Sequence, residues 1–119
     1  MKILLVDDSK TMRMIIQKTL REAGFGGGRI LEAANGMEGL ELVKNEKPSL
    51  ILSDWNMPLL NGIKFLGRLN DMEVKIPFGF VTSEGTESMM QQAKTAGARF
   101  YITKPFTADR FKTELSKIL

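Results

Sequence analysis

The stretch Leu50–Pro58, LILSDWNMP, decides the fold of this 119-residue chain. Its apolar start predicts a buried β-strand, and the strand ends at Asp54, four residues before Pro58. A carboxylate at the rim of a hydrophobic core is costly to desolvate, so it usually has a partner or a chemical task. We therefore expect other polar side chains to gather around Asp54.

Short apolar runs alternate along the whole chain with segments of helical periodicity. The predicted strands are Ile3–Val6, Ile30–Ala33, Leu50–Leu52, Phe78–Val81 and Phe100–Ile102. Between them, apolar positions recur every three or four residues, which predicts five amphipathic helices. These positions are Met12, Ile15, Ile16, Thr19 and Leu20; Met37, Leu40 and Val43; Ile63, Leu66 and Leu69; Met89, Met90, Ala93 and Ala96; and Phe111, Leu115 and Ile118. Such strict alternation predicts an α/β fold, a doubly wound parallel sheet with helices on both faces.

Composition excludes several classes of function. The chain has no cysteine and no histidine, so disulfides, thiolate metal sites and imidazole chemistry are ruled out. Any bound metal must then be held by oxygen, which favours hard cations such as Mg²⁺, Mn²⁺ or Ca²⁺. The net charge of +3 is spread over a mixed surface without a basic cluster, which argues against a nucleic-acid partner. No apolar run is long enough to insert into a membrane and no signal peptide is visible, which favours the cytoplasm.

Polar residues end four of the five predicted strands. They are Asp7 and Asp8, Asp54, Thr82 and Ser83, and Thr103 and Lys104. Ligands of an open parallel sheet collect at the carboxyl ends of its strands, so these side chains should share one edge. Alone, Asp7 and Asp8 could equally be a turn and helix N-cap pair.

If the first and third strands are neighbours, the aspartates at their ends meet and repel one another by a few kcal/mol per pair. Protonation or a divalent cation would relieve that repulsion. An all-oxygen site suits Mg²⁺, and Lys104 adds a positive charge at the same edge. The set is suited to receiving a phosphoryl group, with Asp54 as nucleophile and the cation and Lys104 neutralising the transferred oxygens.

Four motifs, in order, carry a family resemblance: LLVDDS (4–9), SDWNMP followed by NG (53–58 and 61–62), VTSE (81–84) and YITKPF (101–106). The chain resembles a response-regulator receiver domain, most closely the stand-alone, CheY-like chemotaxis type, from Ile3 to Leu119. The resemblance implies a (βα)5 flavodoxin-like fold with strand order 2-1-3-4-5. It also implies a single receiver (response regulatory) domain over residues 1–119, with no effector domain, that acts as a two-component signalling switch. Such a switch catalyses only its own phosphorylation and dephosphorylation.

The resemblance implies a role for each matching residue of the phosphorylation site. Asp54 matches the phosphoacceptor. Asp8, Asp54 and the backbone carbonyl of Asn56 match the ligands of Mg²⁺, for which Mn²⁺ could substitute, and Asp7 would act through a bound water. Thr82 and Lys104 match the residues that hold the phosphoryl oxygens.

The resemblance also implies how the signal is read and ended. Thr82 and Tyr101 match the switch pair, which reports phosphorylation on a face built by helix four, strand five and helix five. Asn56 and Glu84 match the positions that tune dephosphorylation by water, and the Lys104–Pro105 peptide bond is expected to be cis.

The implied partners are a sensor histidine kinase as phosphodonor, a protein target on the output face (the flagellar motor switch or another protein), and a phosphatase. Three residues depart from the usual chemotaxis pattern. Thr86, Glu87 and Glu114 stand where lysines are common, so the charge of the output face differs.

Other functions compete with this hypothesis. A phosphorelay intermediate or a phosphate sink would use the same chemistry without a distinct target. A Mg²⁺-dependent phosphatase of the haloacid-dehalogenase type needs an Asp-x-Asp motif, where this chain has adjacent Asp7 and Asp8. In a flavodoxin-like nucleotide binder, two aspartates after the first strand would repel the phosphate. Gly79, inside a predicted central strand, either lets Phe78 or Phe80 pack closely or marks a bulge.

Overall fold

The computed structural model describes residues 1–119, in which five strands and five helices alternate. The strands are β1 (Lys2–Val6), β2 (Arg29–Ala33), β3 (Leu50–Ser53), β4 (Phe78–Thr82) and β5 (Phe100–Thr103). The helices are α1 (Lys10–Glu22), α2 (Gly36–Glu46), α3 (Gly62–Asp71), α4 (Glu87–Thr95) and α5 (Ala108–Leu115). All strand pairs are parallel and the strand order is β2-β1-β3-β4-β5. The predicted fold and strand order are confirmed, and each predicted strand end lies within one residue of the observed one.

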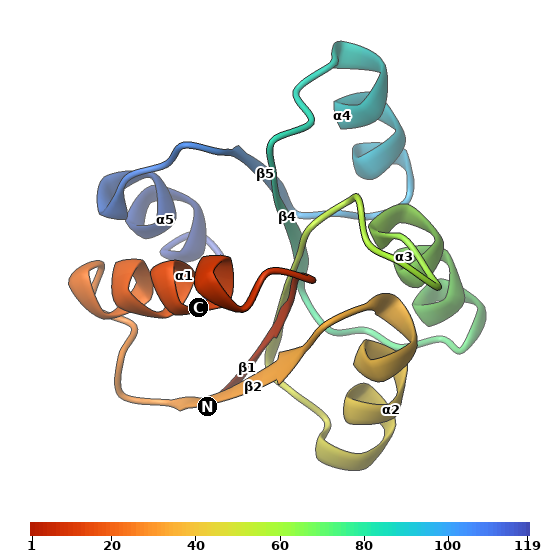
Figure 1. Cartoon of the computed structure of the whole chain (residues 1–119), viewed down its shortest axis with the longest axis horizontal. Helices are drawn as coiled ribbons and strands as arrows, with labels where there is room; N and C mark the ends of the chain where they lie inside the picture. The colour runs from red at the N-terminus through yellow and green to blue at the C-terminus, as the bar shows by residue number, and fades with distance from the viewer.

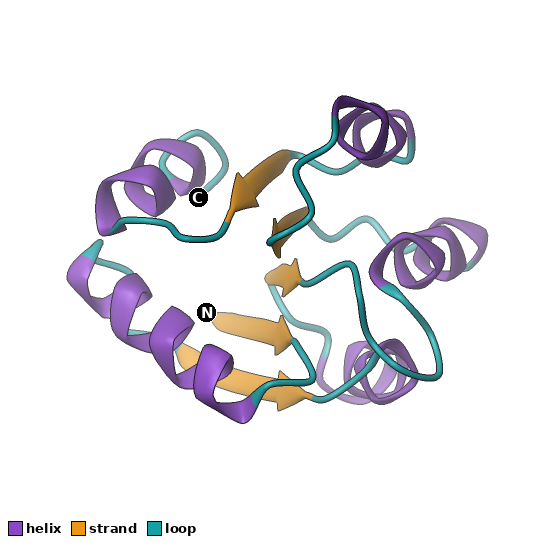
Figure 2. Ribbon diagram, turned by 45° about the horizontal axis from the view of Figure 1, so that its top comes forward, coloured by secondary structure: helices purple, strands orange, loops and turns teal.

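The sheet separates two layers of helices, and each layer closes its own hydrophobic core. Helices α1 and α5 cover one face, and α2, α3 and α4 cover the other (Figures 1 and 2). The first core includes Ile16, Leu20, Phe111 and Leu115, and the second includes Leu40, Phe65, Leu66 and Phe78. Because both faces are covered, the strands are apolar almost throughout, as parallel strands usually are.

Every helix begins directly after a side chain that caps it. The capping residues are Ser9, Asn35, Asn61, Thr86 and Thr107, and each accepts a hydrogen bond from the backbone N–H three residues later. Such caps satisfy otherwise unpaired N–H groups and stop the helix from extending backwards. The cap at the start of α1 is therefore Ser9, and Asp7 and Asp8 are left free for another role. None of the helices is both long and apolar enough to cross a membrane.

Some predicted core positions lie at the surface. Ile15 of α1, Met37 of α2 and Met90 of α4 are 44%, 45% and 37% exposed. Each of these residues lies at the edge of the apolar face of its helix, and only the centre of that face packs against the sheet. Ile118 was expected in the last helix, but α5 ends at Leu115 and Ile118 packs on the core from the turn that follows.

Of the two explanations offered for Gly79, the bulge is wrong. The register runs unbroken through it, with Leu52 on one side and Phe100 on the other, so there is no bulge. The close neighbour on the adjacent strand is Phe100 of β5. A Cβ at position 79 would lie 2.2 Å from two ring carbons of Phe100, so glycine makes room for that ring across the strand pair.

Candidate functional site

The pairing of β1 with β3 brings the aspartates together. Val6 lies opposite Ser53, and the Asp54 N–H donates to the Val6 carbonyl at 2.8 Å, so Asp54 and Asp7 leave adjacent strands side by side. Carboxylate oxygens of Asp7, Asp8 and Asp54 lie within 4.8 Å of one another. The neighbouring strand ends predicted from the sequence therefore meet at one edge of the sheet.

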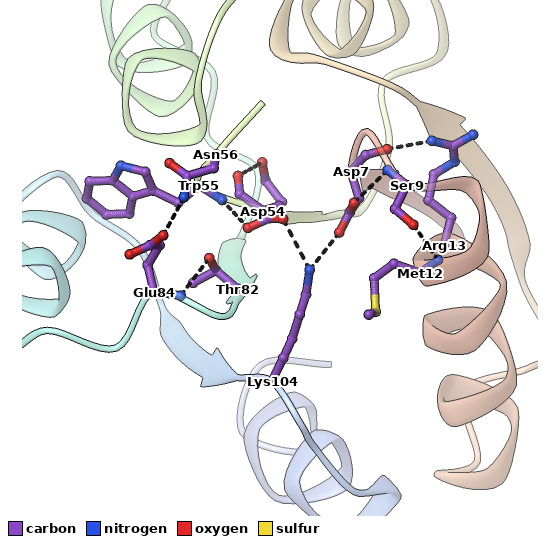
Figure 3. Close-up of polar contacts among 11 residues, drawn as sticks. Asp7, Ser9, Met12, Arg13, Asp54, Trp55, Asn56, Thr82, Glu84 and Lys104 are labelled. Carbon is purple, nitrogen blue, oxygen red and sulfur yellow. Dashed lines mark hydrogen bonds and ion pairs between the residues drawn. The ribbon is translucent and has the colours of Figure 1, made fainter. Parts of the chain in front are cut away.

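Lys104 reaches this acidic cluster from the end of β5. Its Nζ donates to Asp7 Oδ2 at 2.9 Å and to Asp54 Oδ2 at 3.1 Å, and Figure 3 shows the ammonium group pointing between the two carboxylates. Burial alone would lower the pKa of Lys104, but its hydrogen bond to Asp7 and the charges of Asp54 and Asp7 outweigh burial and raise the pKa. Lys104 is thus a permanent cation here. The Lys104–Pro105 peptide bond is cis.

Asp7 is the buried member of the cluster. The residue is 2% exposed, and its Oδ1 accepts a hydrogen bond from the Ser9 N–H at 2.9 Å. Burial raises the pKa of Asp7, against the opposing effects of the Ser9 and Lys104 hydrogen bonds. Asp8, in contrast, is exposed, and its carboxylate is open to a ligand from solvent.

Asp54 is held but accessible. Its Oδ1 accepts from the Trp55 N–H at 2.6 Å, and its side chain is 12% exposed. A carboxylate oriented by a backbone N–H on one oxygen and an ammonium group on the other is fixed in direction, which an attacking nucleophile requires.

Glu84 joins the cluster to the expected switch residues. Its carboxylate accepts from Asn56 Nδ2, its N–H donates to Thr82 Oγ1 at 3.2 Å, and its carbonyl accepts from the Tyr101 hydroxyl. Thr82 is fully buried, and because its oxygen serves as the acceptor here, its hydroxyl proton remains available for donation. The Tyr101 ring packs on Phe80 with centroids 5.7 Å apart. Burial first, and then the charges of Glu84 and Asp54, raise the pKa of Tyr101 and keep its phenol protonated.

The sequence did not reveal what orients the turn after β1. Arg13 on α1 donates through Nη1 to the Asp7 carbonyl, and its Nε pairs with Glu32 of β2 at 2.9 Å. Figure 3 shows the Arg13 guanidinium directed at the Asp7 carbonyl. Through its pair with Glu32, this guanidinium connects the turn after β1 to β2. One helical turn separates Arg13 from its cap, and nothing in that spacing signals the contact.

The donor set fits a hard divalent cation. The three clustered carboxylates offer oxygen only, and one of them is exposed to solvent. Mg²⁺ and Mn²⁺ take such oxygen ligands and retain waters on their open side.

Residues 3–116 match the family described as the response regulator receiver domain. The chain belongs to this family. The receiver is 40% identical over 120 residues to chemotaxis protein CheY-3 of Vibrio cholerae, covering 99% of this chain and 91% of that protein. It is 41% identical over 123 residues to a chemotaxis protein CheY homolog of Campylobacter jejuni, covering 100% and 92%.

Solved structures agree with the fold of this receiver. Chemotaxis protein CheY4 of Vibrio cholerae superposes with a TM-score of 0.84 at 31% identity, covering 99% of this chain and 98% of that one. The receiver is therefore a signalling domain of the CheY type that phosphorylation activates, and it is not a classical enzyme. Family membership sets aside the haloacid-dehalogenase and nucleotide-binding hypotheses.

Proposed function

We propose that this receiver accepts a phosphoryl group on Asp54 from the phosphohistidine of a sensor kinase, in a two-component pathway that controls chemotaxis or motility. One observation carries the proposal. A single ammonium group, Lys104, bridges Asp7 and Asp54 at 2.9 and 3.1 Å, while Asp8 completes a carboxylate cluster within 4.8 Å. The chemotaxis proteins named above support the pathway, because they share about two fifths of their residues with this chain.

The chemistry follows from the orientation of Asp54. A carboxylate oxygen attacks phosphorus as the bond from phosphorus to the histidine nitrogen breaks, and the new bond is an acyl phosphate. The leaving imidazole keeps the electron pair and takes a proton from water. Lys104 compensates negative charge on the transferred oxygens, and the Thr82 hydroxyl is free to donate a hydrogen bond to one of them.

Within this proposal, Asp8, Asp54 and the Asn56 carbonyl would hold Mg²⁺ or Mn²⁺, and Asp7 would act through a water. A bound divalent cation would supply charge neutralisation between the acceptor carboxylate and the incoming phosphoryl group. This division of roles agrees with the burial of the two adjacent aspartates. Asp8 is exposed, whereas the carboxylate of Asp7 is already engaged by Ser9 and Lys104.

The signal would pass from Thr82 through Glu84 to Tyr101. The Glu84 N–H on Thr82 and the Glu84 carbonyl on Tyr101 form one connected path. If Thr82 donates to a phosphoryl group, its hydrogen bond with the Glu84 N–H changes, and the populations of Tyr101 conformers shift. The Asn56 side chain on the Glu84 carboxylate would meanwhile tune how water reaches Asp54.

The helices of the output face, α4 and α5, carry three basic residues, Lys94, Arg110 and Lys112, and three acidic ones, Glu87, Asp109 and Glu114, of which Glu114 stands where a lysine is common. This carboxylate is paired with Arg110 at 2.8 Å and with Lys117 at 3.6 Å, and it is 14% exposed. Arg110 also donates to the Tyr101 carbonyl at 3.0 Å, which links α5 to the switch strand. A protein target of mixed charge, in the flagellar motor or elsewhere, fits such a face. A target whose affinity rises on phosphorylation would distinguish this function from a phosphorelay intermediate or a phosphate sink.

The test is phosphorylation by acetyl phosphate with Mg²⁺, read as mass gain of the intact protein and as fluorescence of Trp55, the only tryptophan. We expect Asp54→Asn to abolish the mass gain. Asp71→Asn, an exposed aspartate at the end of α3, is the matched control and should behave like the parent. Undiminished labelling of Asp54→Asn would refute the assignment. The single-domain organisation and the cytoplasmic location expected from the sequence stay predictions.

A further inference from the structure

The loop between β3 and α3 presents an unusually exposed leucine beside the phosphoacceptor. Leu59 is 82% exposed, more than any other large apolar side chain in the chain. Met37, at the start of α2, is 45% exposed, and the two segments are joined because the Gly36 N–H donates to the Leu60 carbonyl at 3.1 Å. Leu59 and Met37 are thus exposed apolar residues on two segments joined by a hydrogen bond, and the pair is referred to below as the Leu59 patch.

The backbone at Leu59 is held in a conformation that leucine disfavours. Its φ is +66°, in the left-handed region, and the Leu60 N–H donates to the Pro58 carbonyl at 2.7 Å. A hydrogen bond that spans two residues around a positive φ is a γ-turn of the rare, strained kind. Glycine or asparagine would occupy this position at lower conformational cost. The leucine therefore contributes to neither the core nor the turn, and its side chain is free to contact a partner.

The position of the patch identifies the class of partner. The Asp54 side chain is only 12% exposed, so the surface of a protein donor must contact the residues around it before phosphorus comes within about 3.5 Å of an Asp54 carboxylate oxygen. A protein partner covers about 800 Å² on each side, which is a disc about 16 Å in radius. Leu59 is five residues from Asp54, at most about 17 Å along an extended chain. The loop is folded back, since the Gly62 N–H donates to the Trp55 carbonyl at 2.8 Å, so Leu59 lies closer to Asp54 than that extended length and within reach of a partner of this size.

We propose that the Leu59 patch is a docking point for the protein that donates the phosphoryl group. The donor's phosphohistidine domain would receive the Leu59 side chain in an apolar recess, with Met37 at its margin, while its imidazole faces Asp54. This inference rests on the proposed function, because it concerns the protein that delivers phosphate to Asp54. The patch lies on the α2 side of the site and is separate from the α4, β5 and α5 face.

The experiment compares two phosphodonors on the same variants. The protein donor is the autophosphorylated histidine kinase that, among the kinases of the source organism, phosphorylates the parent chain fastest. The small donor is acetyl phosphate, which is too small to contact Leu59 while it reacts at Asp54. We expect Leu59→Asn to lower kcat/KM with the kinase about tenfold, mainly through KM, and to leave the acetyl phosphate rate within twofold of the parent.

Two further variants distinguish the effect of the Leu59 side chain from the effect of the strained turn. Leu59→Met keeps an apolar side chain and should retain kinase transfer within about threefold of the parent. Leu59→Gly relaxes the turn, so it should melt at a higher temperature than the parent and still transfer slowly from the kinase. Met72→Gln, which changes an exposed methionine at the end of α3, is the control and should match the parent with both donors.

Several outcomes would overturn the docking proposal. Equal kinase kinetics for Leu59→Asn and the parent would do so, and so would a parallel fall with both donors, because that result would place Leu59 in the chemistry of the site itself. A fall with a phosphatase alone would assign the patch to dephosphorylation instead. Failure of the parent to react with acetyl phosphate or with any kinase would overturn the proposed function as well, and is recognisable before any variant is made.

Discussion

Replacing Lys104 by methionine should make the stability of the protein depend more strongly on magnesium. Lys104 neutralises Asp7 and Asp54 at 2.9 and 3.1 Å, and Asp8 lies in the same cluster. Two carboxylates 4.8 Å apart repel by about 3 kcal/mol at an effective dielectric near 20. A divalent cation relieves the same repulsion, so Lys104 and the cation compete for one set of oxygens.

Without metal, Lys104→Met leaves two partly buried carboxylates without their counter-ion. Loss of one partner of a buried pair costs about 3–5 kcal/mol, but the Lys104 side chain is 15% exposed and water screens part of the effect. We expect a loss of about 2–3 kcal/mol in the free energy of unfolding at pH 8 in EDTA. For a chain of this size, the melting temperature should fall by about 8–12 °C.

With 10 mM Mg²⁺, we expect the variant to lose less stability relative to the parent than it does in EDTA. The variant lacks the ammonium group that repels the cation, so we expect it to bind Mg²⁺ at least fivefold more tightly, or about 1 kcal/mol. Because a ligand stabilises the folded state according to its affinity, Mg²⁺ should raise the melting temperature of the variant more than that of the parent. Thermal and urea unfolding with and without Mg²⁺ measure both effects.

Lys75→Met, which removes an exposed lysine far along the chain from this cluster, is the control and should change neither quantity. The reasoning fails if Lys104→Met is as stable as this control in EDTA. It also fails if Mg²⁺ stabilises Lys104→Met less than it stabilises the parent, because the lysine and the metal would then not share the carboxylates.

Three further predictions concern residues around this site and in the sheet. Gly79→Val should cost about 2–4 kcal/mol in urea unfolding, because its Cβ would lie 2.2 Å from the Phe100 ring, and adding Phe100→Ala should recover at least half of that loss. Arg13→Lys keeps the charge, but a lysine cannot donate to both Glu32 and the Asp7 carbonyl as the guanidinium does. We expect its Mg²⁺ affinity, measured by fluorescence titration, to fall about threefold to tenfold. An unchanged affinity would contradict the role of the guanidinium. Burial raises the pKa of Asp7 above 3.8, so the folded state holds the Asp7 proton more tightly than the unfolded state does. The resulting contribution to the free energy of unfolding is fully present below pH 3.8 and is lost as pH rises through the pKa of the folded state. In EDTA, Asp7→Asn should therefore be more stable than the parent at pH 7, and the gain should vanish below pH 3.8 in urea titrations; a gain that is independent of pH would contradict this.

Local interactions explain why the elements were predictable. Each strand is a short apolar run bounded by polar residues, and each helix starts at a capping side chain such as Ser9 or Asn61. These signals involve residues at most four positions apart, so they are visible in the sequence. The helix stripes were predicted less well at their margins: Met37 and Ile15 fit the period but face solvent, because only packing against the sheet selects the centre of a stripe.

Gly79 shows what the sequence could not identify. Its partner, Phe100, is 21 residues away along the chain, and only the parallel register of β4 and β5 places them opposite each other. A glycine in a strand indicates that some group approaches closely, but the identity of that group depends on the neighbouring strand.

The sequence by itself determined the alternation of strands and helices and the chemistry available at the strand ends: carboxylates, a hydroxyl and one ammonium group, without histidine or cysteine. Only the tertiary structure decided how these groups meet. It placed Lys104 between Asp7 and Asp54, Arg13 on the turn after β1, and Leu59 on an exposed, strained turn five residues after Asp54. The physical reason is one of range, since residue type and local periodicity act over a few positions, whereas distances between charges are set by strand order and register across the whole chain.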